Sequence, residues 1–277
     1  MKKIINHLIQ LQELSLVREQ EAFMGGDRLK QLDESITGLA QQLPDDVHVI
    51  LRKLQKRDTV AVTQVSAGVC STCGMKLPIS MVQAVRAQQR LTYCPNCSRI
   101  LYCSDTHPRS MAKRQSRTAP PKIGVERFSS PELMLPRLAA EDRDGAIREL
   151  AAKMEEQAFV EHADKLVEAV LRREAIISTA VDHGLAFPHS RGVEGGGLSL
   201  ALGISPKGIK FESQSKTLTH VIFLMTIPTA ANAFYLRLLA GLTETFRAPE
   251  ALAELMAEDD PKKLWKTLKR LTKKTIP

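Results

Sequence analysis

The sequence predicts a mixed α/β (α+β) chain, in which an N-terminal helical hairpin and a cysteine-rich segment precede a mixed sheet flanked by helices. Apolar residues recur at helical spacing near the N-terminus, four cysteines form two close pairs further on, and helical and strand patterns alternate beyond residue 128. A length of 277 residues suits about two domains. The expected division of the chain is 1–66, 67–103, 104–127 and 128–277.

The first segment, 1–66, is predicted to be a helical hairpin with coiled-coil character. Gly25–Gly26 predicts a break between its helices, because each glycine costs about 1 kcal/mol in a helix interior. Pro44 ends the second helix, and Asp45–Asp46 is expected to cap a third. The apolar face of such a hairpin is either packed within the protein, so that the hairpin simply presents the next module, or it binds a partner. Five apolar residues form the predicted seam: Leu29, Leu32, Ile36, Leu39 and Leu43.

The segment 104–127 has clustered Arg and Lys, several prolines and few apolar residues, which predicts a basic linker. The remainder, 128–277, is predicted to form one α/β domain. Its last helix is expected to begin with Asp260 as the N-cap and Pro261 at the first helical position. Other helices are expected at 144–156, 163–174, 231–246 and 249–257, and strands at 185–187, 198–204 and 218–226.

The composition excludes two classes of protein. With 43% hydrophobic and 25% charged residues, the chain is too apolar for a disordered protein and too charged for a membrane-embedded one. Its longest apolar runs are far shorter than the ~18 residues that a membrane-spanning helix needs, and the N-terminus lacks the pattern of an export signal. We therefore expect a cytoplasmic protein with no membrane insertion.

The formal net charge of +8 is unevenly distributed. Residues 128–260 carry 13 basic and 20 acidic side chains, whereas 104–127 carry 6 basic and 2 acidic ones, and 261–277 carry 7 basic and no acidic ones. Basic segments therefore flank an acidic domain. Few aromatic residues accompany the basic ones, so nucleic acid is a partner that the sequence allows but does not favour.

Four cysteines, Cys70, Cys73, Cys94 and Cys97, have the spacing of a zinc site. Two Cys-x2-Cys pairs separated by twenty residues can close tetrahedrally on one Zn²⁺ ion, and four thiolates leave no open position, which is typical of structural zinc. A thiol redox role needs only one such pair and is not favoured. Cys103 is left over, and we expect it to be a small buried side chain or a free thiol.

The residues around these cysteines, 69–78 and 93–102, resemble those of a bacterial family of poorly defined function. Members of that family carry a four-cysteine zinc ribbon at the end of a helical hairpin. The resemblance covers roughly residues 1–103 and implies a module that binds protein or nucleic acid.

His189 is the second candidate. It follows Phe187-Pro188 at the end of a short apolar strand, and because proline fixes the backbone there, we expect the imidazole at a rim with one nitrogen exposed. A neutral imidazole can accept a phosphoryl group without a separate base, and Arg191 together with an upstream arginine can stabilise that group. A surface-loop histidine without a function fits the same few residues.

Residues 128–271 resemble the fructose, mannitol and nitrogen-regulatory type of EIIA domain of the bacterial phosphotransferase system. The resemblance begins at Ser130–Leu133, continues through Arg172–Thr179 and culminates in Gly184–Arg191. In that family the phosphocarrier protein HPr phosphorylates the histidine that His189 matches, with phosphate drawn from phosphoenolpyruvate. Arg173 matches an arginine that supports the phosphoryl group. The resemblance implies a phosphoryl carrier with a regulatory role, and an unknown regulated protein as a further partner.

Two departures from the family pattern bear on this activity. The family loop Ser-Thr-Gly-x-Gly-Asn-Gly corresponds here to Ser178–Gly184, in which two glycines are replaced. Tyr235 occupies the place of a second histidine; its hydroxyl can hydrogen-bond an imidazole or a phosphoryl oxygen but carries no positive charge. We expect a loop role for His183, with compensation for the missing histidine as the alternative. The alternative function is a catalytically degenerate EIIA-like adaptor that binds protein or nucleic acid through its zinc ribbon.

Overall fold

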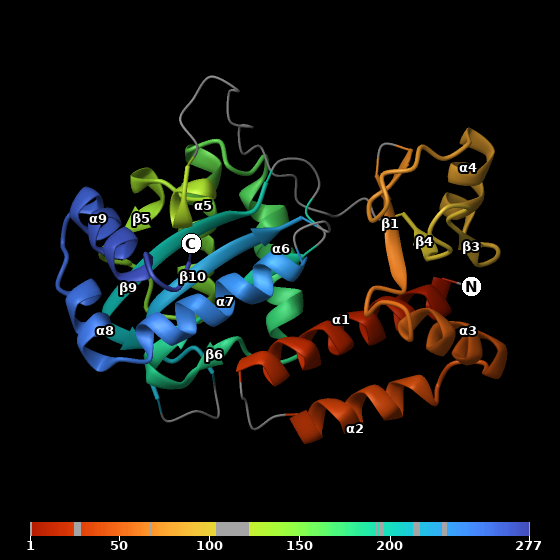
Figure 1. Cartoon of the computed structure of the whole chain (residues 1–277), viewed down its shortest axis with the longest axis horizontal. Coiled ribbons are helices and arrows are strands. Elements are labelled where there is room, and N and C mark those ends of the chain that lie inside the picture. Colours follow the sequence, from red (N-terminus) through yellow and green to blue (C-terminus); the bar gives the residue numbers. More distant parts are fainter. Residues whose placement is uncertain are drawn as a thin grey trace. The chain divides into compact units, whose positions relative to one another are not determined.

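Figure 1 shows the computed structural model of the chain, which describes residues 2–24, 29–66, 68–103, 122–191, 193, 197–212, 217–228 and 232–276. The chain divides into two compact units, Met1–Asp105 and Thr106–Pro277. The predicted helix break at Gly25–Gly26 and residues 104–121 of the predicted linker lie outside the described residues. Within the described parts of the chain, no helix has the length and apolar character needed to cross a membrane.

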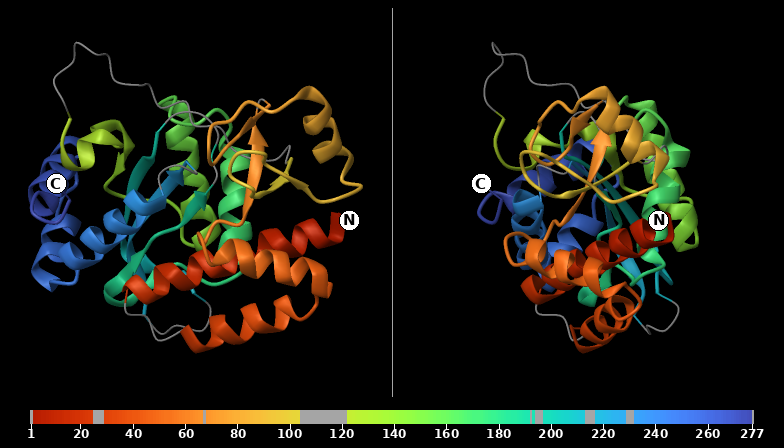
Figure 2. Two further views of the ribbon diagram at one scale, coloured as in Figure 1. Left: turned by 45° about the vertical axis from the view of Figure 1, so that its right-hand side comes forward. Right: turned by 90° about the vertical axis from the view of Figure 1, so that its right-hand side faces the viewer.

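Three helices begin the first unit: α1 (Lys2–Met24), α2 (Leu29–Ala40) and α3 (Asp45–Gln55). Helices α1 and α2 lie side by side, as the turned views in Figure 2 show. Leu32 and Leu43 of the predicted seam are buried, so the seam packs within this unit. The prediction that Asp45 and Asp46 cap α3 is wrong. Pro44 is the N-cap residue, and the two aspartates occupy the first turn, where their charges favour the positive end of the helix.

A small sheet with the strand order β2-β1-β4-β3 completes the first unit. Its strands are β1 (Val62–Ser66), β2 (Val69–Cys70), β3 (Thr92–Tyr93) and β4 (Ile100–Tyr102), and α4 (Ile79–Ala87) separates β2 from β3 in the chain. The side-chain amide of Gln12 in α1 accepts a hydrogen bond from the Val62 N–H at 2.6 Å and donates one to its carbonyl at 2.8 Å. Helices and sheet share a core of Leu8, Leu11, Leu43, Val47, Leu51, Ala61, Val62 and Ile100.

The second unit is built on a mixed sheet with the strand order β5-β9-β10-β7-β6, and β8 also pairs with β10. The long strands β9 (Ser199–Ile209) and β10 (Thr219–Ile227) pair antiparallel and are mostly buried, because both faces of the sheet are apolar. Strands β7 and β8 both run parallel to β10. The short strands are β5 (Met134–Leu135), β6 (Ala180–Val181), β7 (Leu185–Ala186) and β8 (His189–Arg191).

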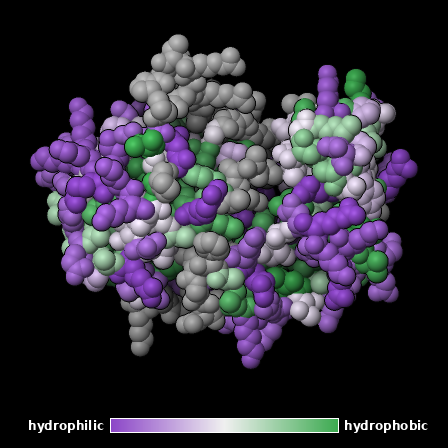
Figure 3. Space-filling view, viewed as in Figure 1, coloured by the Kyte–Doolittle hydropathy of each residue, from purple (hydrophilic) through white to green (hydrophobic). Residues whose placement is uncertain are grey.

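Helices cover both faces of this sheet, with α5 (Arg143–Glu156) and α6 (Ala163–Glu174) on one side and α7 (Asn232–Phe246) on the other (Figure 1). The chain ends with α8 (Pro249–Met256) and α9 (Pro261–Thr272). As predicted, Asp260 caps α9, and its carboxylate accepts hydrogen bonds from two backbone amides. Hydrophilic side chains cover the outer face of α9 (Figure 3). The order of elements confirms the predicted mixed α/β fold.

Three short 3₁₀ helices complete the second unit. They are η1 (Gly124–Arg127), η2 (Pro131–Leu133) and η3 (Asp182–Gly184). The first of them lies at the end of the segment that the sequence assigned to the linker, and its Val125 is buried. The third immediately precedes β7 and so belongs to the approach to His189.

Candidate functional site

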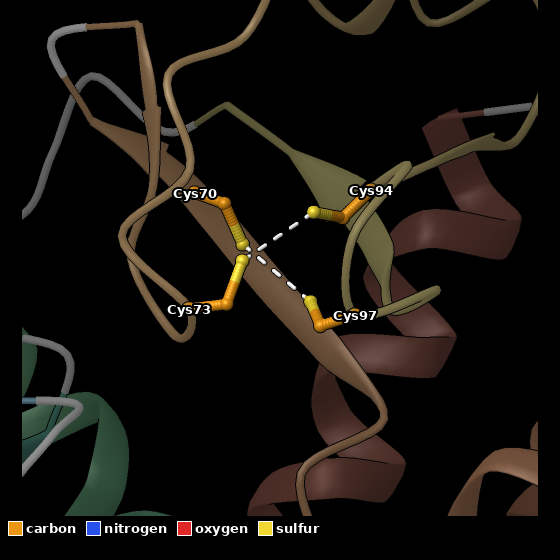
Figure 4. A group of neighbouring side chains, drawn as sticks. All are labelled: Cys70, Cys73, Cys94 and Cys97. Carbon is orange, nitrogen blue, oxygen red and sulfur yellow. Dashed lines mark hydrogen bonds between the residues drawn. The ribbon is translucent and has the colours of Figure 1, made fainter.

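The four paired cysteines of the first unit form a compact cluster (Figure 4). The sulfur atoms of Cys70, Cys73, Cys94 and Cys97 all lie within 4.8 Å of one another. The Sγ atoms of Cys70 and Cys97 are 3.8 Å apart, and those of Cys73 and Cys94 are 3.6 Å apart. A tetrahedral zinc ion with bonds of about 2.3 Å to sulfur has sulfur–sulfur edges of about 3.8 Å. The cluster therefore has the dimensions and the donor set of a four-cysteine zinc site.

The same backbone turn holds each cysteine pair. The Gly74 amide donates to the Cys70 carbonyl at 2.9 Å in the first turn, and the Ser98 amide donates to the Cys94 carbonyl at 2.8 Å in the second. In both turns the amide of the leading cysteine donates to the carbonyl five residues further on, at 2.9 Å. Gly74 and Ser98 both have left-handed backbones, with φ of +74° and +59°. The two halves of the site are thus repeats of one turn.

The two thiols of the first pair differ in how readily they lose a proton. Burial raises the pKa of the Cys70 thiol to about 12. At Cys73 burial opposes ionisation, but hydrogen bonds from the Met75 amide and the Asn96 side chain lower the pKa to about 6. Zinc binds thiolates, so its binding displaces the proton of Cys70. Because four ligands leave no open coordination position, the metal that fits these residues is structural.

His189 begins β8 and lies opposite Met225 of β10. The Met225 amide donates to the Pro188 carbonyl at 3.0 Å, which fixes the proline to the central strand. The expectation that one ring nitrogen of His189 is exposed is wrong, because the side chain is completely buried. The physical reason is the packing of α7 over this end of the sheet: the Tyr235 and His189 ring centroids are 5.0 Å apart.

The contacts of Nδ1 determine which nitrogen of His189 carries the proton. The Phe187 carbonyl oxygen is 2.9 Å from Nδ1, and the Tyr235 hydroxyl is 3.0 Å from it. A carbonyl oxygen can only accept, so the neutral ring carries its proton on Nδ1. Nε2 is buried and has no hydrogen-bond partner among the described residues. The lone pair of the ring therefore lies on Nε2, which is its nucleophilic atom.

Two arginines make the surroundings of the ring positive. The pKa of His189 lies well below its usual range, first because the ring is buried and then because of the charges of Arg173 and Arg191. Nη1 of Arg173 donates to the Ile177 carbonyl at 2.7 Å, and Cζ of Arg191 lies 4.9 Å from the centre of the Tyr235 ring. Burial raises the pKa of Tyr235, so its hydroxyl stays protonated. The two guanidinium groups can therefore attract an anionic group to the neutral imidazole.

The altered loop before this histidine has an unstrained backbone where the glycines are replaced. Those positions are Ala180, in β6, and Asp182, and neither has a positive φ. The left-handed residues of the loop are His183, with φ of +67°, and Gly184, with φ of +76°. The side chains of Asp182 and His183 are exposed, whereas His189 is buried. This difference favours a loop role for His183.

Two features of the site were not predicted from the sequence. Glu174, next to Arg173, is buried and accepts hydrogen bonds from the Thr179 amide at 3.0 Å and the Thr179 hydroxyl at 2.5 Å. The backbone carbonyl of Phe187, which fixes the tautomer of the ring, is the second. Glu174 could have been found from the sequence, because it is a carboxylate next to the site arginine at the end of an amphipathic helix. The Phe187 carbonyl could not, because no side-chain pattern identifies a backbone group.

The second unit is thus an α/β domain with a buried histidine and two arginines, and the first carries a four-cysteine ribbon. Residues 127–271 match the family described as phosphoenolpyruvate-dependent sugar phosphotransferase system, EIIA 2, and residues 69–101 match the C4-type zinc ribbon domain. The chain belongs to the EIIA type-2 family and carries a zinc ribbon in addition. The family expected from the sequence is confirmed.

Several known proteins are similar to the EIIA domain. A nitrogen regulatory protein of Bradyrhizobium diazoefficiens is 30% identical over 142 residues, which are 50% of this chain and 90% of the relative. A fructose-specific EIIA component of the phosphotransferase system of Haloferax volcanii is 26% identical over 114 residues, or 41% of this chain and 74% of the relative. The solved structure of nitrogen regulatory protein IIA-Ntr from Neisseria meningitidis covers 51% of this chain and 96% of its own, with 20% identity and a TM-score of 0.47.

A further solved structure is similar to a part of this chain. The structure of CT398 from Chlamydia trachomatis covers 28% of this chain and 34% of its own, with 29% identity and a TM-score of 0.26.

Proposed function

We propose that the EIIA domain accepts a phosphoryl group on Nε2 of His189 from a phosphocarrier protein such as HPr, and that it serves as a regulatory phosphoryl carrier. The observation that supports this most strongly is the state of the ring. Nδ1 is engaged by the Phe187 carbonyl, and the lone pair of Nε2 has no partner among the described residues. The regulatory role draws on the similarity to a nitrogen regulatory protein.

In the proposed step, the lone pair of Nε2 forms a bond to phosphorus while the bond between phosphorus and the donor breaks. The proton of Nδ1 remains in place, so the ring becomes cationic, and the Phe187 carbonyl and the Tyr235 oxygen accept from it. The charges of Arg173 and Arg191 stabilise the oxygens of the transferring group. Because Nε2 is buried, docking of the donor must expose it.

For the N-terminal unit, we propose that its four cysteines hold one structural Zn²⁺ and that the unit contacts the regulated protein. The dimensions of the sulfur cluster support the metal. Unpaired thiols available to zinc are typical of a reducing compartment, which supports a cytoplasmic location.

The complete burial of His189 favours a second candidate, an EIIA-like adaptor that no longer takes up phosphate and acts only through its zinc ribbon. Binding to nucleic acid is one form of this candidate. A salt titration tests that form, because contacts to phosphates predict a steep loss of affinity as the salt concentration rises.

A labelling experiment separates the two candidates. The full chain, loaded with zinc, is incubated with ³²P-labelled phosphoenolpyruvate, enzyme I and HPr beside an authentic EIIA domain. We expect an acid-labile, base-stable label on the wild type and on His183→Gln, whose altered side chain is exposed, and none on His189→Gln. If the wild type stays unlabelled while the authentic EIIA domain is labelled, the carrier function is wrong and the adaptor is favoured.

A further inference from the structure

Glu174 is a buried carboxyl group for which the phosphoryl-transfer step has no direct use. It is the last residue of α6, its side chain is only 3% exposed, and its two oxygens bind separate groups of Thr179. Burial raises the pKa of this carboxyl, and the charge of Arg173 opposes that rise. A buried carboxyl of this kind is costly unless its hydrogen bonds are satisfied, and here Thr179 satisfies both oxygens.

The hydrogen bonds continue from Thr179 to the histidine. The Phe187 amide donates to the Thr179 carbonyl at 3.2 Å, and Nδ1 of His189 donates to the Phe187 carbonyl at 2.9 Å. The N–H and C=O of Thr179 belong to different peptide groups, as do those of Phe187, so this series of bonds crosses two Cα atoms and links Glu174 to the imidazole through position rather than through charge. In each of these hydrogen bonds the acceptor lies on the side of Glu174 and the donor on the side of the histidine, so the last donor is the Nδ1–H of the ring.

These hydrogen bonds determine the position of one carbonyl group. Glu174 holds Thr179, and the Thr179 carbonyl holds the Phe187 amide, so the carboxyl group fixes where the Phe187 carbonyl lies against Nδ1 of the ring. The hydrogen bond at one ring nitrogen of a histidine sets which nitrogen is protonated. Second-shell carboxylates that bond directly to histidine ligands of metals act in this manner.

We propose that Glu174 is a positioning residue that holds the proton of His189 on Nδ1, and so keeps the lone pair on Nε2, through the hydrogen-bonded chain across Thr179 and Phe187. The inference deepens the proposed function and rests on it only for its catalytic consequence. The same segment carries the Ile177 carbonyl that binds Arg173, so Glu174 orients the ring and one of its arginines together.

The test is the tautomer of His189 in the full, zinc-loaded chain, observed by NMR with ¹⁵N-labelled histidine and assigned through the signal lost in His189→Gln. We expect the Nδ1–H form to dominate in the wild type. Glu174→Gln leaves one acceptor oxygen for the two donors of Thr179, and Thr179→Val removes the hydroxyl; both loosen the position of the Phe187 carbonyl and should raise the Nε2–H fraction several-fold. Glu168→Gln is the matched control, because it removes an exposed charge from the same helix.

The outcomes separate this inference from the carrier function. Far-UV circular dichroism and Trp265 fluorescence establish that each variant is folded. An unchanged tautomer in folded Glu174→Gln and Thr179→Val overturns the positioning role. If the tautomer changes but the wild type takes up no label from HPr, the positioning role holds and the carrier function fails. If both hold, the labelling rate should fall in parallel with the Nδ1–H fraction, whereas Glu168→Gln is labelled like the wild type.

Discussion

The Tyr235 hydroxyl lies 3.0 Å from Nδ1 of His189, and both side chains are completely buried within the EIIA domain. Tyr235→Phe removes this hydroxyl and leaves the Phe187 carbonyl as the partner of Nδ1. We expect the free energy of unfolding to fall by about 1 kcal/mol, the usual contribution of a hydrogen bond. Urea unfolding followed through Trp265, the single tryptophan of the chain, measures this change. Tyr93→Phe in the ribbon is the control, and equal midpoints for the two variants contradict the prediction.

The fold of the EIIA domain was predictable wherever its signals are local. Both ends of the helix predicted at 163–174 agree with α6, and the cap of α9 follows from Asp260 and Pro261. Strand β9 continues to Ile209, beyond its predicted end at residue 204, because an irregularity in its register with β10 lets Ile209 pair with Thr219. The ribbon strands have two to five residues, too few to show a period.

The candidate site was predictable in its residue types but not in its depth. The zinc cluster follows from spacing alone, since each half is a local turn. The burial of His189 depends on Tyr235, which lies 46 positions further along the chain on another helix. The chain of bonds from Glu174 passes through backbone groups, which carry no sequence signal. The residues of the site were therefore recognisable, whereas the hydrogen bonds that set their chemistry required the three-dimensional structure.

Removal of one zinc ligand is expected to unfold the ribbon. Its small core includes two of the cysteines themselves, Cys70 and Cys94, so little apolar packing remains to hold the short strands once the metal is lost. Cys94→Ser should reduce the zinc content from one ion per chain to near zero by elemental analysis and expose the ribbon to proteolysis. Cys103→Ser is the matched control and should keep its zinc. Retention of a full zinc ion by Cys94→Ser contradicts the proposed ligand set.

Substitutions at Gly74 and Ser98, which occupy equivalent positions in the two cysteine turns, are expected to have opposite effects on zinc binding. Both have left-handed backbones, which cost a residue with a side chain roughly 1–2 kcal/mol. Gly74→Ala should therefore weaken zinc binding about tenfold, although a methyl group there meets no atom within 4 Å. Ser98→Gly relieves that cost and should strengthen zinc binding, by less than tenfold because glycine also loses more entropy on folding. Competition with a chromophoric chelator measures both, and effects of the same sign refute the argument.

The burial of His189 predicts a loss of stability in mild acid. Burial, Arg173 and Arg191 lower the pKa of the folded histidine well below 6.5, whereas an unfolded histidine titrates near that value. Below about pH 6.5 the unfolded chain therefore binds a proton that the folded chain does not, so stability falls with pH by up to about 1.4 kcal/mol per unit. From pH 7.0 to 5.5 this histidine alone should remove about 1 kcal/mol.

His189→Asn isolates this contribution, because it deletes the titrating group and leaves the other ionisable residues in place. Urea unfolding at pH 7.0 and 5.5, followed through Trp265, should show that the variant loses about 1 kcal/mol less than the wild type on acidification. His183→Asn, at an exposed loop position, should lose as much stability as the wild type. If His189→Asn and the wild type lose equal stability, the folded histidine takes up its proton as readily as the unfolded one. Neither its burial nor the two arginines then keep the ring neutral, and the lone pair of Nε2 is not preserved below pH 6.5.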